Sequence, residues 1–594
     1  MGGGFFSCGP VYNDGMARFA LRCRLEACLL LILMAAGAWA APAPNDLLAG
    51  VPLTGAGATP LGTPHGPGLR IVVPRPTDPD YDLQLSAPVP AAVQDGQVLR
   101  LHFWGRSPTR NPIRAVYEKY SEPYTKALNK TVLLSPQWKE YAFAFKTPAY
   151  PALGAAVHFV VGRQAGTVEL AGVALEDYGV NPQPTPPDIN LDLYGGVPHD
   201  DTWRAAANAR IRRYRMGGLA VRVVDAHGRP VSGAQVRVHQ TKHAFRFGTA
   251  LAYEPLFAQT PDGEKYRQTV LRLFNYVVLE NALKWDSYGS FEPADKMLTW
   301  CRQHQLPVRG HNLFWPSYMW LPANVRSLRG QAMRQAVHDH IVDYVSRARG
   351  RVVVWDVVNE AVTSHEVYDE AGKDLIAKAF VWAHETDPNV ALAYNDNTIF
   401  DMEGSTRGVN DAKVDAILHY LIDDQHAPVT ELGIQSHMGG GAPLVPAPYL
   451  IHNLDHWATY HLPIEITEFD ASIRDDAAHG AYLDEFMTAM FSHPQVRSFV
   501  MWGFWAGAHW LADQGGAMIN RDWTPRPAER VYERLVFHDW WTNAQGKTDK
   551  GGIYRVRVFL GDHNVTVTRG GETKTVPASV TKNEDGQAVV MVRL

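Results

Sequence analysis

The chain contains few cysteines and little net charge. Four of its 594 residues are cysteine, and Cys8, Cys23 and Cys28 all lie near the N-terminus. If that segment is removed only Cys301 remains, which excludes an internal disulfide, and its apolar helical context favours an inert, buried thiol. The net charge is −5. This is too small for long-range attraction to nucleic acid or a membrane, so we expect neither as a partner.

Sequence signals for cofactors are also missing. We find no Gly-rich turn of the kind that holds a phosphate between a strand and a helix. His239 and His243 flank a predicted strand but have no carboxylate partner at the spacing of a metal site. We therefore expect no metal and no other cofactor.

No apolar run favours a membrane span. The longest candidate covers residues 27–37, which is short for a bilayer. Arginines precede this run and Ala38-Trp39-Ala40 follows it, a pattern typical of a signal peptide and its cleavage site. We predict a signal peptide over residues 1–40, with Met16 as a possible true start. The mature protein would then be secreted, periplasmic or on the cell surface, without a stable membrane span; an uncleaved anchor is the alternative.

Composition divides the remaining chain into several segments, as its length leads one to expect. Residues 41–69 are rich in Gly, Pro, Ala and Thr and are predicted to form a linker. Residues 70–180 have short alternating apolar runs and predict a jelly-roll-like β-sandwich. Residues 181–240 read as a Pro-rich linker followed by a β-hairpin. Residues 241–542 form the largest segment, and residues 543–594 predict a small C-terminal β appendage.

The largest segment alternates strand and helix patterns eight times, which predicts a (β/α)8 TIM barrel. Helical periods such as 330–347, 373–386 and 481–491 separate the strand candidates. The strand candidates are Phe245–Ala250, Tyr276–Glu280, Pro307–Trp315, Val352–Glu360, Ala391–Asn395, Glu431–His437, Pro463–Glu468 and Ser498–Phe504.

Polar and aromatic residues follow the predicted strands at the end where barrels carry their chemistry. Neutral hydrogen-bonding groups and flat aromatic faces suit the hydroxyls and rings of sugars. Two carboxylates, Glu360 at the end of the fourth strand and Glu468 at the end of the seventh, are the equipment for cleaving a glycosidic bond. The residues at these strand ends are Glu280, Asn281, Lys284, His311, Trp315, Asn359, Glu360, Gln435, His437, Glu468, Asp470 and Trp502.

Several strings at these strand ends together resemble glycoside hydrolase family 10, the endo-β-1,4-xylanases, over about residues 240–540. They occur in family order. They are Phe245-Arg246-Phe247-Gly248, Glu280-Asn281-x-x-Lys284-Trp285, Arg309-Gly310-His311-x-x-x-Trp315, Trp355 to Glu360, Gln435-Ser436-His437, Thr467-Glu468-Phe469-Asp470, and Trp502-Gly503 with Trp510.

The resemblance implies a retaining endo-1,4-β-xylanase with xylan as its polysaccharide partner. Glu468 matches the nucleophile and Glu360 the acid/base, which retention would place about 5–5.5 Å apart. Asn359 and His437, with Asp470 orienting His437, match residues that support catalysis. The positions matching substrate-binding residues are Glu280, Asn281, Lys284, His311, Trp315, Gln435, Trp502 and Trp510.

Two departures leave the substrate open. Pro316 replaces a histidine that usually follows the tryptophan of the third strand, and Asn397 replaces an aromatic residue after the fifth. The alternatives are the same mechanism on another β-1,4-glycan, such as mixed-linkage glucan, cellulose or an unusual xylan, and a non-catalytic sugar-binding protein. The sequence does not predict an oligomeric state.

The predicted N-terminal sandwich resembles the sugar-binding jelly rolls often appended to such xylanases. The string from Trp138 to Phe145 carries this resemblance. Its candidate binding face comprises Trp104, Tyr117, Tyr120 and Tyr124. Core packing is the favoured explanation for these aromatic residues, since the cores and rims of sandwiches use them anyway.

Overall fold

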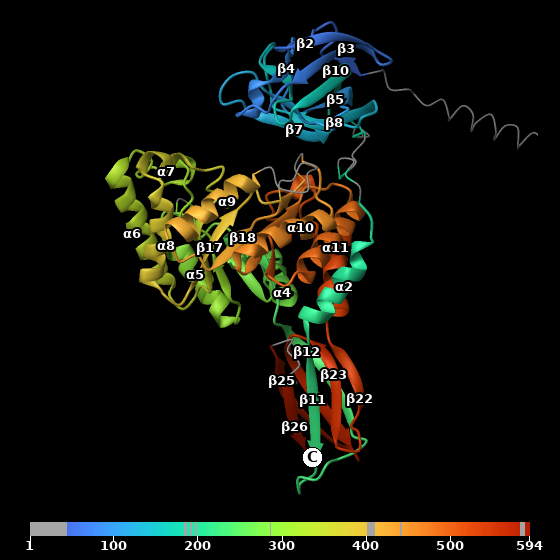
Figure 1. The fold of residues 1–594 in the computed structure, drawn as a ribbon, viewed down its shortest axis with the longest axis vertical. Helices are drawn as coiled ribbons and strands as arrows, with labels where there is room; N and C mark the ends of the chain where they lie inside the picture. Colours follow the sequence, from blue (N-terminus) through green and yellow to red (C-terminus); the bar gives the residue numbers. More distant parts are fainter. Residues whose placement is uncertain are drawn as a thin grey trace, which may run out of the picture.

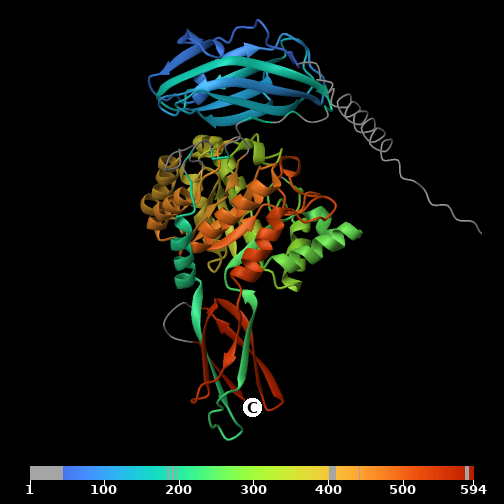
Figure 2. The ribbon, with the colours of Figure 1, turned by 90° about the vertical axis from the view of Figure 1, so that its right-hand side faces the viewer.

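The chain folds into an N-terminal sandwich, a central barrel and a smaller sandwich that contains the C-terminus (Figures 1 and 2). The structure is a computed structural model. It describes residues 44–594 except 183–185, 187, 190–192, 195–196, 198, 286, 401–409, 440–441 and 582–587. The predicted signal peptide, residues 1–40, lies outside the described residues. Among the helices that are described, none has both the length and the apolar character needed to cross a membrane.

The N-terminal part consists of two antiparallel sheets packed face to face. One sheet has the order β2-β3-β10-β5-β8 with β1 paired to β10, and the other has the order β4-β9-β6-β7. Inward-facing side chains such as Leu101, Phe103 and Phe159 are fully buried in one apolar core. The strands are β1 (Asn45–Asp46), β2 (Ala58–Thr63), β3 (Gly66–Val73), β4 (Gln84–Pro88), β5 (Gln97–Arg106), β6 (Pro112–Lys119), β7 (Lys126–Leu133), β8 (Lys139–Thr147), β9 (Ala155–Val160) and β10 (Gly166–Val180), with a 3-10 turn, η1, at Asp80–Asp82.

The sandwich begins earlier than predicted, because residues 41–69 are not a linker throughout. They contain β1, β2 and the start of β3, which pair with the sheet. Pro60 lies on the edge strand β2, where proline is tolerated. A Cβ at Gly68 would lie 2.6 Å from the Leu170 carbonyl oxygen, so close approach of β10 requires glycine there. The Gly- and Pro-rich composition therefore belongs to a sheet edge.

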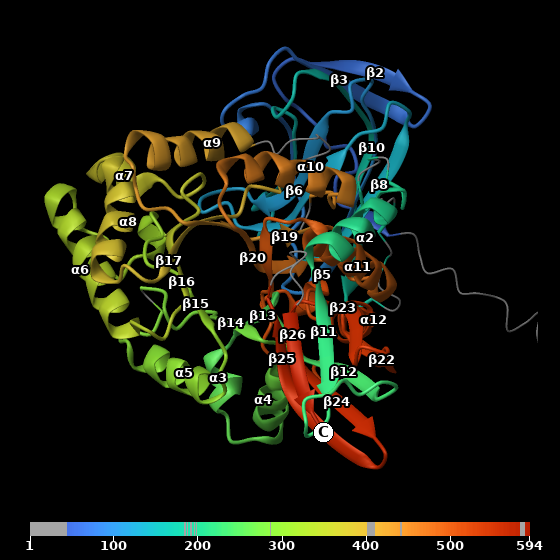
Figure 3. The ribbon, with the colours of Figure 1, turned by 60° about the horizontal axis from the view of Figure 1, so that its bottom comes forward.

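The central part is a closed barrel of eight parallel strands surrounded by helices, which confirms the predicted (β/α)8 fold (Figure 3). Pairing of β18 with β20 closes the ring. The strands are β13 (Arg246–Leu251), β14 (Tyr276–Leu279), β15 (Val308–Gly310), β16 (Val354–Asn359), β17 (Ala391–Asp396), β18 (Glu431–Ile434), β20 (Ile464–Ala471) and β21 (Val496–Met501), and the short β19 (His437–Met438) pairs with β20.

Most of the barrel helices bury one apolar face against the strands. Cys301 lies on such a face of α5, as predicted, and burial raises the pKa of its thiol to about 12. The helices are α3 (Tyr253–Phe257), α4 (Pro261–Leu273), α5 (Glu292–Gln303), α6 (Gly330–Ala348), α7 (Glu366–Ala371), α8 (Asp374–Thr386), α9 (Asp411–His419), α10 (Ala447–Trp457), α11 (Asp476–Ser492) and α12 (Pro527–Arg534). Short 3-10 or π turns are η2 (Tyr318–Trp320), η3 (Tyr420–Asp424), η4 (Ala458–Tyr460), η5 (Ala512–Gln514) and η6 (Leu535–Asp539).

Strand β15 is much shorter than the predicted run from Pro307 to Trp315. It ends at Gly310, where a Cβ would lie 2.2 Å from the Trp355 ring of β16. The chain returns to β16 three residues later, since Leu313 and Phe314 again donate backbone hydrogen bonds to that strand. The interruption leaves His311 at the end of the regular strand.

The predicted hairpin within residues 181–240 does not form. Strands β11 (Met216–Val224) and β12 (Gln235–His243) belong to different sheets, with the orders β23-β11-β26 and β22-β12-β24-β25. Each needs partners from the predicted C-terminal appendage, so the two segments together build one sandwich with a shared valine-rich core. The C-terminal strands are β22 (Asn543–Lys547), β23 (Ile553–Phe559), β24 (Gly561–Arg569), β25 (Glu572–Val580) and β26 (Ala588–Arg593).

The segment predicted as a linker also contains a helix, α2 (Trp203–Tyr214). Its buried residues Trp203, Ala207 and Ile211 recur at every fourth position, so one stripe of the helix packs on the barrel. Arg215, directly after the helix, donates hydrogen bonds to backbone carbonyls that include those of Phe491 and Val496. The helix therefore joins the small sandwich to the barrel wall.

A buried ion pair network fills the barrel interior below the strand ends. The Arg309 guanidinium is fully buried and contacts the carboxylates of Asp356 and Glu465, with Nη1 2.7 Å from Oε2 of Glu465. Tyr276 also donates to Glu465, at 3.2 Å. Arg246 contacts the other Glu465 oxygen at 2.7 Å. Buried charges are tolerated only when paired, and Arg309 is the residue that joins the two carboxylates.

We expect Arg309→Met to lower the free energy of unfolding of the barrel by about 3–5 kcal/mol, because it removes the guanidinium from the buried Asp356 carboxylate and leaves buried Glu465 paired with Arg246 alone. Urea denaturation followed by tryptophan fluorescence measures this loss. Arg302→Met, at an exposed position on α5, is the matched control and should change stability by less than about 0.5 kcal/mol. Equal stability of the two variants would contradict the importance of the network.

Candidate active site

The backbone around Glu360 sets the direction of its side chain. Glu360 follows β16 directly and has a φ of 56°, in the left-handed region that few residues other than glycine adopt. Its N–H donates to the Asn395 carbonyl at 2.8 Å. The pairing of β16 with β17 shifts register between Asp356 and Val358, just before this point. These irregularities turn Glu360 away from the regular strand pattern.

Glu468 lies within β20 and is almost completely buried. Its N–H donates to the Gln435 carbonyl at 3.0 Å, which ties it to the end of β18. The register with β21 shifts between Ile466 and Phe469, so an irregularity also accompanies this carboxylate. Only 4% of Glu468 is exposed, so its ionisation depends on the protein groups around it.

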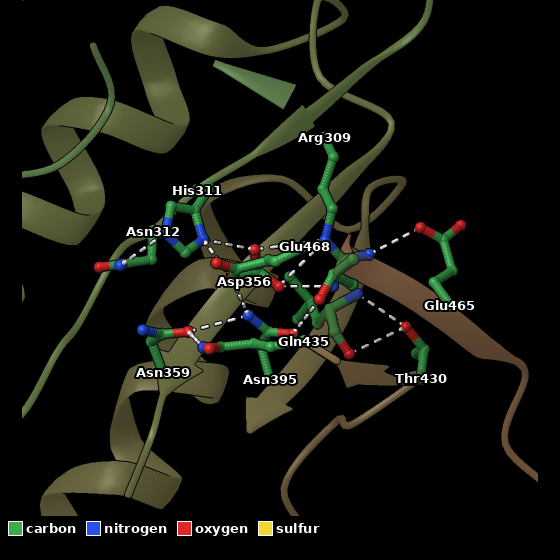
Figure 4. A network of polar contacts seen from close by, with 12 residues as sticks. Arg309, His311, Asn312, Asp356, Asn359, Asn395, Thr430, Gln435, Glu465 and Glu468 are labelled. Carbon is green, nitrogen blue, oxygen red and sulfur yellow. Dashed lines mark hydrogen bonds and ion pairs between the residues drawn. The ribbon is translucent and has the colours of Figure 1, made fainter. Parts of the chain in front are cut away.

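Three amide side chains connect the two carboxyl groups. Gln435 Nε2 donates to Glu360 Oε1 at 2.9 Å and to Asn359 Oδ1 at 3.2 Å. Asn395 Nδ2 donates to the same Asn359 oxygen at 2.9 Å and to Glu468 Oε1 at 2.8 Å. A continuous chain of hydrogen bonds thus runs from Glu360 through Gln435, Asn359 and Asn395 to Glu468. Figure 4 shows its members Gln435, Asn359, Asn395 and Glu468.

His437 places a positive charge beside Glu468. Its Nδ1 lies 2.9 Å from Asp470 Oδ1, and its Nε2 lies 3.4 Å from Glu468 Oε2. Burial acts to lower the pKa of His437, but Asp470 and Glu468 outweigh it and raise the pKa to about 10. The other Asp470 oxygen accepts the indole N–H of Trp510 at 2.7 Å. Near neutral pH His437 is therefore an imidazolium.

A second chain of charges approaches Glu468 from the barrel interior. His311 Nδ1 lies 2.9 Å from Asp356 Oδ2 and 3.6 Å from Glu468 Oε1. Asp356 in turn contacts Arg309, which extends to Glu465 (Figure 4). Asp356 therefore links the core network to the histidine beside Glu468.

These surroundings push the pKa values of the two glutamates apart. Burial raises the pKa of Glu360 to about 7, and the negative charge of Glu468 adds to this effect. For Glu468 burial acts in the same direction, but His311 and His437 outweigh it and lower the pKa to about 2. Between these values one group keeps its proton and the other is charged, the combination required of a general acid beside a nucleophile.

Aromatic rings and an ammonium group form one wall next to the carboxyl pair. Lys284 Nζ lies 5.6 Å from the ring centroids of both Trp315 and Trp502, and it donates to Asn281 Oδ1 at 3.0 Å. Trp315 is stacked on Trp320 with the ring centroids 4.2 Å apart. Such a wall offers both flat apolar faces and hydrogen-bonding groups, which is what a sugar ring requires.

Two polar atoms of the amide chain remain available to a ligand. Within the described part of the chain, Asn359 Nδ2 and Gln435 Oε1 are buried and have no hydrogen-bond partner. Buried polar groups without partners are uncommon in folded proteins. One donor and one acceptor between the two carboxyl groups fit the hydroxyls of a sugar.

Possible metal ligands also occur here. Atoms of His311, Asp356 and Glu468 lie within 4.8 Å of one another. However, the Asp356 carboxylate already contacts the Arg309 guanidinium, whose charge would oppose a cation at this position. We interpret the group as part of the hydrogen-bond network.

The structure places every predicted site residue at the carboxyl end of the barrel. Most contact the chain between the two glutamates or the neighbouring wall. Glu280 stands apart from the carboxyl pair and lines an adjoining pocket with Asn281 and Trp510. Trp502 is largely buried, whereas 60% of Trp510 is exposed.

Sequence reasoning assigned no role to Asn395 or Asp356. Asn395 donates to Glu468, and Thr467 fixes its amide by donating to Asn395 Oδ1 at 2.8 Å. The sequence signal for Asn395 was its position at the end of the fifth predicted strand. For Asp356 the only signal was that it is a charged residue inside an apolar strand. Such a residue indicates a buried partner but does not identify it.

A model of a known protein family matches the segment that forms the barrel. Residues 237–534 match the family model described as glycosyl hydrolase family 10. Since the match covers half of the chain, the protein belongs to glycosyl hydrolase family 10, and the resemblance read from the sequence is confirmed.

The proteins that are similar in sequence include an anti-sigma factor and several xylanases. The chain is 32% identical over 380 residues to anti-sigma-I factor RsgI6 of Acetivibrio thermocellus, covering 63% of this chain and 47% of that protein. It is 28% identical over 369 residues to endo-1,4-beta-xylanase 1 of Arabidopsis thaliana, covering 61% and 38%. The chain thus spans about half or less of the length of these relatives.

Solved structures also resemble the chain. Xylanase 10B from Thermotoga petrophila RKU-1, solved in complex with xylobiose, is 26% identical, with a TM-score of 0.45. The match covers 50% of this chain and 95% of that one.

We expect Glu468→Gln to lower the pKa of Glu360 below about 7, because a neutral amide no longer opposes the negative charge that Glu360 acquires on ionisation. Carbon NMR of protein labelled at the glutamate carboxyl carbons would follow this titration. Glu385→Gln, at an exposed position on α8, should leave the Glu360 pKa unchanged. An equal or higher pKa in Glu468→Gln would show that the two carboxyl groups do not interact.

Proposed function

We propose that the protein is a retaining, endo-acting glycoside hydrolase that cleaves internal β-1,4-xylosidic bonds of xylan by double displacement. The observation that carries the proposal is the pair of carboxyl groups of half-buried Glu360 and buried Glu468, joined by amide side chains and held in opposite protonation states. Family membership and the xylanases among its relatives support the choice of xylan.

In the first step Glu468 attacks the anomeric carbon while Glu360 donates its proton to the leaving oxygen. The C–O bond to the departing sugar breaks and an ester forms with Glu468. The free Asn359 Nδ2 is suited to bind a hydroxyl of the sugar under attack, where such a bond strengthens as charge develops.

In the second step water replaces the enzyme at the anomeric carbon. Esterification removes the negative charge of Glu468, which had helped to keep Glu360 protonated, so Glu360 now acts as the base that activates water. The active form of the free enzyme has Glu468 charged and Glu360 protonated. It therefore exists above about pH 2 and is lost as the pH rises through about 7.

The wall around Lys284 favours a pentose. Its ammonium group lies close to both Trp315 and Trp502, which leaves little room for the hydroxymethyl group that distinguishes glucose from xylose. Parallel rates on xylan and on mixed-linkage glucan decide between these substrates.

Variants of the two glutamates test the mechanism. Glu468→Ala should abolish hydrolysis of xylan and of aryl xylosides, whereas Glu360→Ala should spare the first step on aryl xylosides with acidic leaving groups and cripple it on xylan. Azide should restore product formation in both variants, giving a β-xylosyl azide with Glu360→Ala and an α-xylosyl azide with Glu468→Ala.

Glu385→Ala provides the control and should behave as the wild type. Substantial turnover of xylan by Glu468→Ala, or equal losses on both substrates by correctly folded Glu360→Ala, would contradict the assigned roles. Proton NMR of the first sugar released by the wild type should show the β anomer, and an initial α anomer would exclude retention.

We also propose that the N-terminal sandwich binds polysaccharide and that the protein acts outside the cytoplasm. Tyr120 and Tyr124 support binding, since they are 46% and 49% exposed and lie in the turn between β6 and β7. Tyr117 does not belong to this face, contrary to our expectation, because it is fully buried in the sandwich core. Trp104 is covered on one side by the stacked ring of His65.

Replacing both Tyr120 and Tyr124 by alanine should weaken binding to insoluble xylan about tenfold or more, because each exposed ring offers a stacking face. Rates on soluble aryl xylosides should stay nearly constant. Depletion of protein from solution by insoluble xylan measures the binding. Val72→Ala, an exposed position on the other sheet, is the control. Unchanged depletion in the double variant would show that these tyrosines do not bind the polysaccharide.

A further inference from the structure

Asp396 is a completely buried carboxylate close to Glu360 that the mechanism above does not use. It is the last residue of β17, directly after Asn395, and none of its surface is exposed. Within the described ranges of the chain, no lysine, arginine or histidine forms an ion pair with it. Buried carboxylates without a cation are uncommon, and groups of this kind concentrate at functional sites.

Hydrogen-bond donors surround the Asp396 carboxylate in place of a cation. Thr398 donates to Oδ1 from its backbone N–H at 2.8 Å and from its hydroxyl at 2.6 Å. The Tyr394 hydroxyl donates to Oδ2 at 2.5 Å, and the backbone N–H of Val362 supplies a further hydrogen bond. Burial raises the pKa of Asp396, but all of these donors favour its charged form. The surroundings therefore suit an ionised carboxylate.

Asn395 and Asp396 together hold the backbone turn that carries Glu360. Glu360 has a φ of 56°, in the left-handed region, and its N–H donates to the Asn395 carbonyl at 2.8 Å. Two residues further along, the Val362 N–H bonds to the Asp396 side chain. Strained backbone persists only where the surrounding structure fixes it. Asp396 is one of the groups that fix this turn.

The main chain of Asp396 also fixes the amide that contacts Glu360. The Asp396 carbonyl accepts the Gln435 N–H at 3.1 Å, and the Gln435 side chain donates to Glu360 Oε1 at 2.9 Å. Asp396 is thus connected with Glu360 through the turn and through Gln435. Its charge acts on the same group: burial raises the pKa of Glu360 to about 7, Glu468 and Asp396 add to the rise, and Gln435 and His437 oppose it.

No neighbouring titratable group cancels the charge of Asp396. The groups that face it are Tyr394 on its own strand, Tyr368 of α7 and Glu360 itself. Burial raises the pKa of Tyr368 to about 12 and holds that of Tyr394 well above its usual value, so both tyrosines are neutral near pH 7. The field of an ionised Asp396 therefore reaches Glu360 without compensation from these neighbours.

We propose that Asp396 is a positioning residue for the acid/base: its buried negative charge keeps Glu360 protonated, and its hold on the turn keeps Glu360 directed at the other carboxyl group. The proposal rests on the proposed function for its kinetic consequence, because only a general acid needs that proton. The interaction between the two carboxyl groups can be measured without any substrate.

Asp396→Asn removes the charge and keeps the size of the side chain. We expect the pKa of Glu360 to fall by about one unit, because Glu360 no longer ionises beside this carboxylate. Carbon NMR of the full-length protein, labelled at the glutamate carboxyl carbons, measures the shift. Asp387→Asn is the matched control, since Asp387 is buried just before the other end of β17, and it should change nothing. An unchanged Glu360 titration in folded Asp396→Asn would overturn the proposal.

A second variant covers the case in which Asp396→Asn does not fold. Thr398→Val removes the hydroxyl donor from Oδ1, so a larger fraction of Asp396 is protonated near pH 7. The pKa of Glu360 should then move in the same direction as in Asp396→Asn, by a smaller amount. No movement, or a rise, would contradict the assigned role.

Rates against pH separate this role from a purely structural one. In Asp396→Asn the loss of kcat/KM on xylan with rising pH should begin about one unit lower, which reduces turnover at pH 7 about fivefold and leaves turnover near pH 5 almost unchanged. Aryl xylosides with acidic leaving groups should lose less, since their first step needs no proton donor. Equal losses at every pH and on both substrates would contradict the proposal. Failure of the proposed function would look different: the wild type would hydrolyse no xyloside, with the NMR shift still present.

Discussion

The ionised state of Glu468 is the condition on which the rest of the site depends. A carboxylate with 4% exposure keeps its charge only if cationic and donor groups replace water around it. His437 supplies a full positive charge, maintained by Asp470. His311 and Asn395 approach the other carboxylate oxygen. Because the charge is stabilised from two sides, burial can raise the pKa of Glu360 without neutralising its neighbour.

This arrangement explains why the barrel interior is polar below the strand ends. Arg309 holds Asp356 in place, Asp356 contacts His311, and His311 faces Glu468. Replacing Arg309 by an apolar residue would remove the cation at the base of this chain. The ion-pair network thus positions His311 beside Glu468 as well as contributing to stability. Burying its charges costs desolvation free energy, which limits the stability that it can contribute.

The barrel and the position of Glu360 and Glu468 at its mouth could be predicted from the sequence because both depend on local patterns. Apolar runs set the strands, and a residue just after a parallel strand lies at the barrel mouth wherever the other strands fall. The role of Asn395 could not be predicted, since it depends on contacts with Asn359 and Glu468 from two other strands. The failed hairpin has the same cause: β11 and β12 take their partners from more than 300 positions away.

The order of the two sandwiches and the barrel along the chain determines which sandwich lies near the active site. Strand β12 leads into the start of β13, so the C-terminal sandwich lies at the amino end of the barrel strands, away from the carboxyl pair. The N-terminal sandwich lies on the other side of the barrel (Figures 1 and 2). Its Lys130 is close enough to Arg474, in the loop after β20, for the two charges to interact. A polysaccharide held by that sandwich would therefore be presented to the same face of the barrel as Glu360 and Glu468.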